Sequence, residues 1–420
     1  MDDAASQKSI YGFVAILALF ATGRAMVFFR CTALYWIALL SFGCDAMESI
    51  PEPEPRTGRG ATLSVRTLGE TSAAEISSNF VTIGLPVAVR YGVTTYKIVY
   101  ETIDATGSVT TASGAILVPA GVPTPMSLLS LEHGTVVRRD AAPSASESAR
   151  LIGVAFATSG YMVAMADLLG LGDSPGLHPY VHAATSSTAV VDMLRATTDF
   201  AASEGLDISG KLFLAGYSQG GYTAMAAHWA LEADHADEFR VTASAPMAGP
   251  YDLSGVMAMV MTGPRPHPSP YYLPYTLLAY NAVYRLYPDA SAFFRSPYDK
   301  RLPPLFDGMH SGGQINAQMP RVPGHILLPS IVAEFAADAD HPFRRVLQEN
   351  DVYDWAPRAP IRLYHCAADQ LVPFENSRVA LRHLQARGAD VQLIDPLPVG
   401  DHLACAPLSF ILAKTWFDSF

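Results

Sequence analysis

The chain contains little charge for its length. Only 16% of its 420 residues are charged and 50% are hydrophobic, a composition that excludes disorder and indicates a large buried core. The net charge is −11, and basic residues gather only in short pairs such as Arg138-Arg139 and Arg344-Arg345. Since nucleic-acid-binding proteins carry a basic patch, we exclude nucleic acid as a partner. The sequence sets no oligomeric state.

Cysteine is also scarce. None of the four cysteines has the spacing of a zinc motif, so we expect no metal site. Cys31 and Cys44 fall in an N-terminal leader. Cys366 and Cys405 remain, either as a disulfide of an exported protein or as two free buried thiols.

No apolar run in the leader reaches the roughly 20 residues that span a bilayer. Read from Met26, the segment up to Cys44 has a basic start, an apolar stretch and a small-residue end, as secretory signal peptides do. Residues 41–43, Ser-Phe-Gly, also resemble the end of a lipoprotein signal. We predict that residues 1–44 export the chain, which is then secreted or tethered at the cell envelope. An uncleaved membrane anchor is the alternative, and translation starts at Met1 or Met26.

The rest of the chain divides into a linker, a core and an insertion. Residues 45–75 are rich in proline, glycine and charge, which predicts a flexible linker. Short apolar strands then alternate with helices over residues 76–250 and again over 350–420, without any internal repeat. This order predicts an α/β fold, a mostly parallel sheet with helices on both faces.

The insertion, residues 251–349, is rich in aromatic side chains and lacks the strand–helix alternation. We expect a helical cap whose tyrosines line an apolar pocket. Alternatively, any one of these tyrosines packs the core of the cap itself. The six are Tyr271, Tyr272, Tyr275, Tyr280, Tyr284 and Tyr287.

One serine lies on a tight turn between a strand and a helix. Ser218 stands in Gly-Tyr-Ser-Gln-Gly, after the apolar segment KLFLAGY and before an alanine-rich helix. Gly216 and Gly220 allow the strand and helix backbones to approach closely, and the N–H of Gln219 can stabilise an oxyanion. We therefore predict Ser218 as a nucleophile.

A second Gly-x-Ser-x-Gly motif, residues 172–176, is a decoy. Ser174 is followed by Pro175, which has no N–H to offer an oxyanion. No helix follows this motif directly, so we interpret Ser174 as a loop residue.

A serine nucleophile requires a base and a carboxylate that orients the base. His402 follows the last predicted strand and precedes the last predicted helix, and Asp369 ends the strand segment IRLYHCAAD. Asp401 adjoins His402, but side chains of sequence neighbours point apart. Loops at the carboxyl ends of parallel strands share one edge of the sheet, so we predict a triad of Ser218, Asp369 and His402.

The segment LEHGT predicts the second half of an oxyanion hole. Its strand ends at Glu132, and the following turn can direct the N–H of Gly134 or of Thr135 at the developing oxyanion. His133 is better read as a residue that shapes this loop than as a base.

The two C-terminal cysteines flank the predicted acid and base. Cys366 lies three residues before Asp369, and Cys405 lies three residues after His402. If the carboxylate and the imidazole touch, the cysteines are close enough to pair.

Taken together, these stretches resemble the α/β-hydrolases, in particular secretory lipases and related exported bacterial serine esterases. The resemblance covers about residues 126–405, including GYSQGGYTAMAA, HCAADQLVPFENS and GDHL. It implies the α/β-hydrolase fold with a helical cap, and the triad of Ser218, Asp369 and His402. It also implies hydrolysis of a small-molecule or lipid ester, an apolar acyl site and no cofactor.

Three other functions remain open on sequence alone. A peptidase or an acyltransferase can use the same triad. A non-catalytic binding protein tethered at the envelope can keep the hydrolase fold, although no triad member is missing here.

Overall fold

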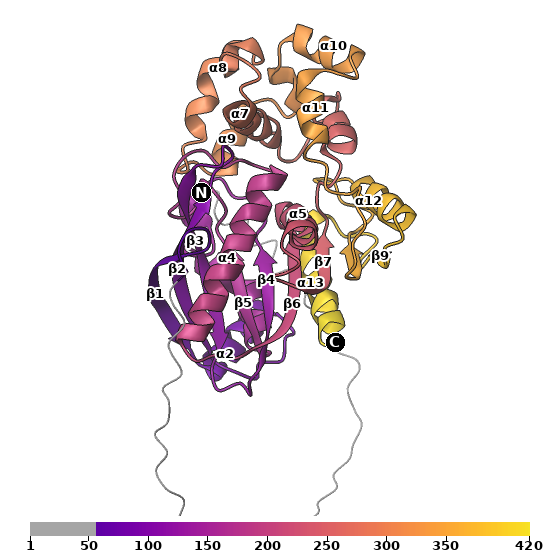
Figure 1. Cartoon of the computed structure of the whole chain (residues 1–420). Coiled ribbons are helices and arrows are strands. Elements are labelled where there is room, and N and C mark those ends of the chain that lie inside the picture. Colours follow the sequence, from indigo (N-terminus) through magenta and orange to yellow (C-terminus); the bar gives the residue numbers. More distant parts are fainter. Residues whose placement is uncertain (1–55) are drawn as a thin grey trace, which may run out of the picture.

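The computed structural model describes residues 56–420. The predicted leader, with Met26 and Cys44, lies outside these residues. A wide sheet with helices on both faces carries a layer of short helices at one end (Figure 1). No helix within residues 56–420 combines the length and the hydropathy of a transmembrane span.

The sheet has nine strands in the order β1-β2-β3-β5-β4-β6-β7-β8-β9. The first three strands are antiparallel, β3 is antiparallel to β5, and every pairing from β5 through β4 to β9 is parallel. The predicted α/β class is thus confirmed. The strands are β1 (Thr62–Thr71), β2 (Val93–Ile103), β3 (Val109–Pro119), β4 (Met126–Glu132), β5 (Tyr161–Ala166), β6 (Ile208–Tyr217), β7 (Val241–Met247), β8 (Ile361–Tyr364) and β9 (Val391–Ile394).

Each face of the sheet is buried under its own helices. Along β3, Ala112 and Ile116 join the cluster under α4 and α5, whereas Ala115 and Leu117 join the cluster under α2, α3 and α13. This alternation follows the two-residue period of a strand. The helices of this part are α2 (Ala73–Ile83), α3 (Glu147–Ala157), α4 (Ala183–Ser203), α5 (Gln219–Asp234), α12 (Glu375–Ala386) and α13 (His402–Phe417), and η1 (Arg139–Ala141) is a 3-10 turn between β4 and α3.

The segment between β7 and β8 contains the short helices of the cap, which gather over one end of the sheet (Figure 1). An isolated bridge between Phe294 and Leu327 is the β pairing within it. The elements are η2 (Leu253–Met257), α6 (Ala258–Thr262), α7 (Tyr272–Tyr284), η3 (Ala290–Ala292), α8 (Tyr298–Arg301), η4 (Pro303–Leu305), α9 (Gly312–Asn316), η5 (Pro323–Ile326), α10 (Pro329–Ala337) and α11 (Pro342–Gln348).

Two predicted boundaries are wrong. The linker predicted over residues 45–75 contains β1 and the start of α2. As an edge strand, β1 is exposed along almost its whole length, so it lacks the apolar pattern of a buried strand. The last helix begins at His402 itself, because the Asp401 carboxylate accepts the N–H groups of Leu403 and Ala404 and caps it there.

Candidate active site

Ser218 stands between β6 and α5 in a strained backbone conformation. Its φ of 61° and ψ of −121° are rare for a residue with a side chain and cost on the order of 1–3 kcal/mol. The turn is held because the Ser218 N–H donates to the carbonyl of Met247 on β7 (2.9 Å). Such strain raises the hydroxyl above the strand end, where Ser218 lines a pocket.

The glycines on either side of Ser218 are required by close backbone contacts. A Cβ on Gly216 would lie 2.2 Å from the carbonyl oxygen of Gly220. A Cβ on Gly220 would lie 2.1 Å from the carbonyl oxygen of Glu132. No side chain fits at either position, so this turn depends on both glycines.

Asp369 and His402, 33 residues apart, meet in the structure. His402 Nδ1 lies 2.5 Å from Asp369 Oδ2, and both side chains are buried. The other carboxylate oxygen accepts the N–H groups of Leu371 and Val372, each at 2.9 Å. Burial alone would raise the pKa of Asp369, but hydrogen bonds from His365 and His402 outweigh it and hold that pKa well below its ordinary value. The carboxylate is therefore charged and fixed, as an orienting group must be.

The imidazole of His402 lies beside the turn that carries Ser218. The Tyr217 hydroxyl donates to the His402 carbonyl (2.7 Å), and the two rings are 4.9 Å apart between centroids. Within residues 56–420, however, no hydrogen bond joins the Ser218 hydroxyl to a nitrogen of His402. The structure thus brings the acid and the base together and places them near the serine, and the serine–histidine contact stays a prediction.

The two predicted parts of the oxyanion hole lie against the same turn. Gln219 is the first residue of α5, where its N–H has no acceptor within the helix. A Cβ on Gly134 would lie 3.6 Å from the carbonyl oxygen of Tyr217. The hydroxyl oxygen of the next residue, Thr135, lies 3.1 Å from the hydroxyl oxygen of Tyr180. The two ring nitrogens of His133 face the carbonyls of Gly134 (2.7 Å) and Asp167 (3.0 Å), which is how this histidine shapes the loop.

A histidine that the sequence analysis missed holds the Gln219 side chain. His178 Nδ1 lies 2.7 Å from the Leu169 carbonyl, and His178 Nε2 lies 2.7 Å from Gln219 Nε2. Burial lowers the pKa of His178 to about 3, so the ring is neutral and its Nε2 accepts from the amide of Gln219. In the sequence, His178 stands in the segment Leu-His-Pro-Tyr at the end of a long loop. Such a loop segment does not indicate a contact with a residue 41 positions away.

The decoy serine has no catalytic surroundings. Ser174 is 1% exposed, and within residues 56–420 its hydroxyl oxygen has no hydrogen-bond partner. No histidine therefore activates it, in agreement with the prediction from Pro175.

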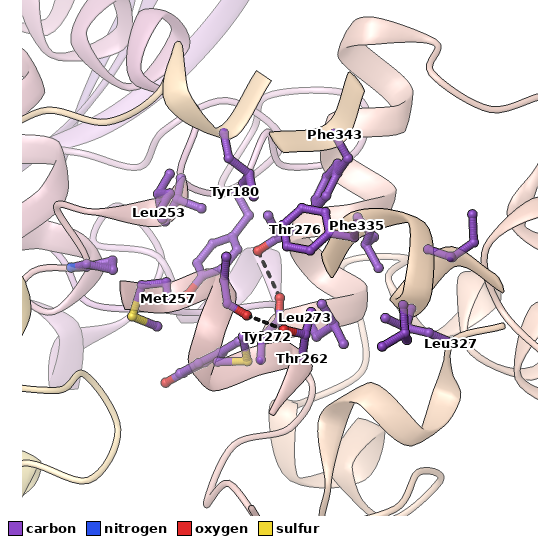
Figure 2. Close-up of a pocket in the computed structure, with 18 of the residues that line it drawn as sticks. Tyr180, Leu253, Met257, Thr262, Tyr272, Leu273, Thr276, Leu327, Phe335 and Phe343 are labelled. Carbon is purple, nitrogen blue, oxygen red and sulfur yellow. Dashed lines mark hydrogen bonds between the residues drawn. The ribbon is translucent and has the colours of Figure 1, made fainter. Parts of the chain in front are cut away.

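The Ser218 side chain lies at the wall of an apolar pocket. Most of its wall comes from the cap, including Leu273, Leu327, Phe335 and Phe343 (Figure 2). Two threonines also line it, but their hydroxyls are used within their own helices. Thr262 donates to the Ala258 carbonyl (2.7 Å), and Thr276 donates to the Tyr272 carbonyl (2.9 Å), as the dashed lines in Figure 2 show. The threonines thus offer the pocket no unsatisfied hydroxyl donor.

The six tyrosines of the insertion divide between the two predicted roles. Tyr272 and Tyr287 line the pocket. Three others are buried in the cluster that joins the cap to the core, and Tyr284 contacts Asn350 Nδ2 (2.7 Å) and His182 Nε2 (3.2 Å). The three buried tyrosines are Tyr271, Tyr275 and Tyr280.

Cys366 and Cys405 form a disulfide with a Cα–Cα distance of 5.9 Å, which is one of the two alternatives that the sequence left open. The bridge closes a loop that contains both Asp369 and His402. Within residues 56–420 there is no group of three or more His, Cys, Asp or Glu side chains placed to hold a metal ion.

Comparisons with known proteins place this site in a family. The family model described as "Serine aminopeptidase, S33" matches residues 143–269, which include Ser218. The rice cell wall degrading esterase LipA from Xanthomonas oryzae is 30% identical, with a TM-score of 0.75 over 86% of this chain and 97% of the esterase. The chain belongs to the lipase-like α/β-hydrolases.

Other structures agree with this assignment. A Legionella pneumophila protein described as a hydrolase is 28% identical to our α/β-hydrolase, with a TM-score of 0.80 over 85% of this chain and 97% of that one. Lipase A of Candida antarctica, 16% identical with a TM-score of 0.62, covers 83% of this chain and 78% of its own and shares the fold. Among curated proteins, none matches this α/β-hydrolase by sequence.

Proposed function

We propose that this α/β-hydrolase is a serine carboxylic-ester hydrolase that acts through an acyl-enzyme on esters with apolar acyl chains. The observation that carries the proposal is the apolar pocket that opens on Ser218 beside the Asp369–His402 pair. The substrate is a small-molecule or lipid ester whose acyl chain occupies this pocket.

The reaction proceeds in two steps. The Ser218 oxygen attacks the ester carbonyl while His402 takes the hydroxyl proton and passes it to the departing alcohol, which leaves the acyl group on Ser218. Water then attacks the acyl-enzyme while His402 takes its proton, and His402 returns that proton to the Ser218 oxygen as the acid leaves. Asp369 keeps the His402 Nδ1–H directed at its carboxylate and stabilises the imidazolium through the 2.5 Å contact.

Backbone N–H groups stabilise the oxyanion of each tetrahedral intermediate. The Gln219 N–H supplies one donor, and the loop at Gly134 and Thr135 supplies the other. Loss of one such donor costs about 2.7–4 kcal/mol of transition-state stabilisation.

The matching family is described as a serine aminopeptidase, so a peptidase is the second candidate function. An aminopeptidase has to hold the α-ammonium group of its substrate, and a carboxylate is the usual partner for such a cation. Among the described residues that line the pocket, none is Asp or Glu. An acyl chain therefore suits this site better than a peptide N-terminus. An acyltransferase would share the acyl-enzyme and differ only in the acceptor alcohol.

We further propose that the enzyme works outside the cytoplasm, secreted or tethered at the cell envelope. The Cys366–Cys405 disulfide supports this location, because disulfides persist in oxidising compartments.

The test uses the full chain and p-nitrophenyl esters of graded acyl length. We expect turnover on medium or long acyl chains, and Ser218→Ala should lower kcat by about 10⁴-fold to 10⁶-fold. Ser174→Ala is the matched control, because it alters the same motif without a base nearby, and its kcat should stay within twofold of the wild type. If no ester is turned over in a Ser218-dependent way, the non-catalytic binding protein is the better interpretation.

A further inference from the structure

His365 is a buried histidine in direct contact with Asp369. It follows β8 directly, is fully buried, and has the ring of Phe374 against it at 5.4 Å between centroids. His365 Nε2 lies 3.1 Å from Asp369 Oδ2 and 2.9 Å from the Val372 carbonyl oxygen. His365 Nδ1 lies 2.7 Å from the Ser377 hydroxyl on α12. The mechanism above assigns this side chain no role.

The partners of His365 determine which nitrogen carries the proton. Both groups at Nε2 are oxygens that can only accept, a carboxylate and a carbonyl, so Nε2 must carry the hydrogen and share it between them. In a neutral ring, Nδ1 is then an acceptor, and the Ser377 hydroxyl is the donor that satisfies it. A directed chain therefore runs from Ser377 through His365 to Asp369.

The same carboxylate oxygen, Asp369 Oδ2, also receives the Nδ1–H of His402. Within residues 56–420 the carboxylate has four donors, which are Leu371, Val372, His365 and His402. The first two fix Oδ1, and among these four His365 is the one donor besides the base that fixes Oδ2. Without it, the position of Oδ2 relative to His402 would depend on His402 alone.

We propose that His365 is a positioning residue, which through its Nε2–H holds Asp369 Oδ2, and thereby the His402 ring, in register with Ser218. This inference rests on the proposed function. It assigns to a residue outside the triad the task of keeping the acid–base pair aligned during turnover.

Two amide substitutions separate the contact with Asp369 from the packing of the ring. In His365→Gln the amide nitrogen takes the place of Nε2 and can still donate to Asp369. In His365→Asn the amide oxygen takes the place of the accepting Nδ1 and reaches Ser377 only, so no donor faces Asp369. We expect kcat to fall about tenfold to thirtyfold in His365→Asn with KM within twofold, because a hydrogen bond to a charged group is lost. In His365→Gln, kcat should stay within about threefold of the wild type.

His228 supplies a matched control. It is equally buried, with Nδ1 at 2.8 Å from the Ser244 hydroxyl and Nε2 at 3.1 Å from the carboxylate of Glu232, but neither partner belongs to the triad. His228→Asn should lower the melting temperature and leave kcat within twofold. A cooperative thermal unfolding transition verifies that each variant has folded.

A spectroscopic readout decides the matter without catalysis. The proton between His402 and Asp369 should give a low-field NMR resonance in the wild type and in His365→Gln, and this resonance should broaden or vanish in His365→Asn. If the wild type hydrolyses no ester, the proposed function fails and the resonance alone tests His365. The positioning role is overturned if His365→Asn keeps both kcat and the resonance, or if both amide variants lose them equally.

Discussion

The sheet core and the cap contribute to the site in different ways. Ser218, Asp369 and His402 belong to the core, each in a segment that follows a strand, and Asp369 and His402 are held by several hydrogen bonds. The pocket wall belongs mainly to the cap, where the hydroxyls of Thr262 and Thr276 turn back to their own helices. The hydrogen-bonded polar groups of the site are thus concentrated at one edge of a regular sheet. The apolar wall of the pocket is supplied by the short helices of the cap.

This contrast teaches how the two parts can change. A polar group of the core acts only at one position, because hydrogen bonds fall off steeply with distance and angle. The cap acts through volume and apolar area, which vary gradually with side-chain size. Substitutions in the core should therefore alter the reaction rate, and substitutions in the cap should alter the choice of acyl chain.

The largest expected effect comes from the core carboxylate. Asp369→Asn should lower kcat by about 10⁴-fold, because an amide cannot keep the His402 tautomer or stabilise the imidazolium. Asp401→Asn is the matched control: asparagine caps a helix as well as aspartate does, so its kcat should stay within twofold. Steady-state kinetics on one p-nitrophenyl ester measures both. Equal losses of kcat in the two variants would show that Asp369 is not the carboxylate that orients His402.

Removal of the disulfide should come next. The double variant Cys366→Ala/Cys405→Ala removes the bond between two residues that are 39 positions apart in the chain. In the chain-entropy model, its free energy of unfolding should fall by about 2–4 kcal/mol. Urea denaturation measures the loss, and kcat should fall with it because the same loop carries the acid and the base. An unchanged urea midpoint would show that the bridge does not form in solution.

A pH effect on stability is expected at Glu132, at the carboxyl end of β4. Burial raises the pKa of Glu132 from 4.5 to about 8, against the hydrogen bond from Ser130. Its second carboxylate oxygen is buried and has no hydrogen-bond partner within residues 56–420. The folded state thus keeps a proton that the unfolded state loses above pH 4.5. The stability that this group contributes is full below pH 4.5 and is lost as the pH rises to about 8.

The magnitude follows from the same linkage and is on the order of 5 kcal/mol over that pH range. Glu132→Gln cannot ionise, so the difference in unfolding free energy between variant and wild type should grow from pH 5 to pH 8. Urea denaturation at both pH values measures it. A difference that stays constant would mean that Glu132 ionises in the folded protein as readily as in the unfolded chain.

The smallest expected effect belongs to the cap. Leu273 lines the pocket, so Leu273→Phe should shorten the room for the acyl chain. We expect kcat/KM to fall about tenfold for long acyl chains and to change less than twofold for acetate, since one to two methylenes are worth about 1.4 kcal/mol. The exposed Met259 on α6 gives the control, Met259→Phe, which should leave the chain-length profile unchanged. A uniform loss on all esters would break the contrast between core and cap.

Local sequence order was sufficient wherever a motif and its physical reason lie within one turn. The strand, the two glycines and the helix around Ser218 are neighbours in the chain. The order of strands and helices in the core likewise follows from local patterns along the chain. By contrast, β1 went unrecognised because an edge strand needs no apolar face. The start of α13 at His402 depended on one capping carboxylate, that of Asp401.

Contacts between distant segments could not be predicted in the same way. His178 and Gln219 are 41 residues apart, and nothing around either of them indicates the other. His365 lies four residues from Asp369, yet no sequence pattern indicates that the two side chains meet. Nor does any pattern indicate that His365 and His402 share one carboxylate oxygen of Asp369. The wall of the pocket likewise depends on how the cap helices pack.

The amino-acid order alone determined the fold class and the three residues proposed to carry the reaction, because strand periodicity, glycine turns and helix starts are short-range properties of the backbone. Only the tertiary structure decided which histidines support Gln219 and Asp369, which tyrosines face the pocket and which pack inside. The physical reason is that hydrogen bonding and close packing act between atoms a few ångströms apart, whatever their separation along the chain.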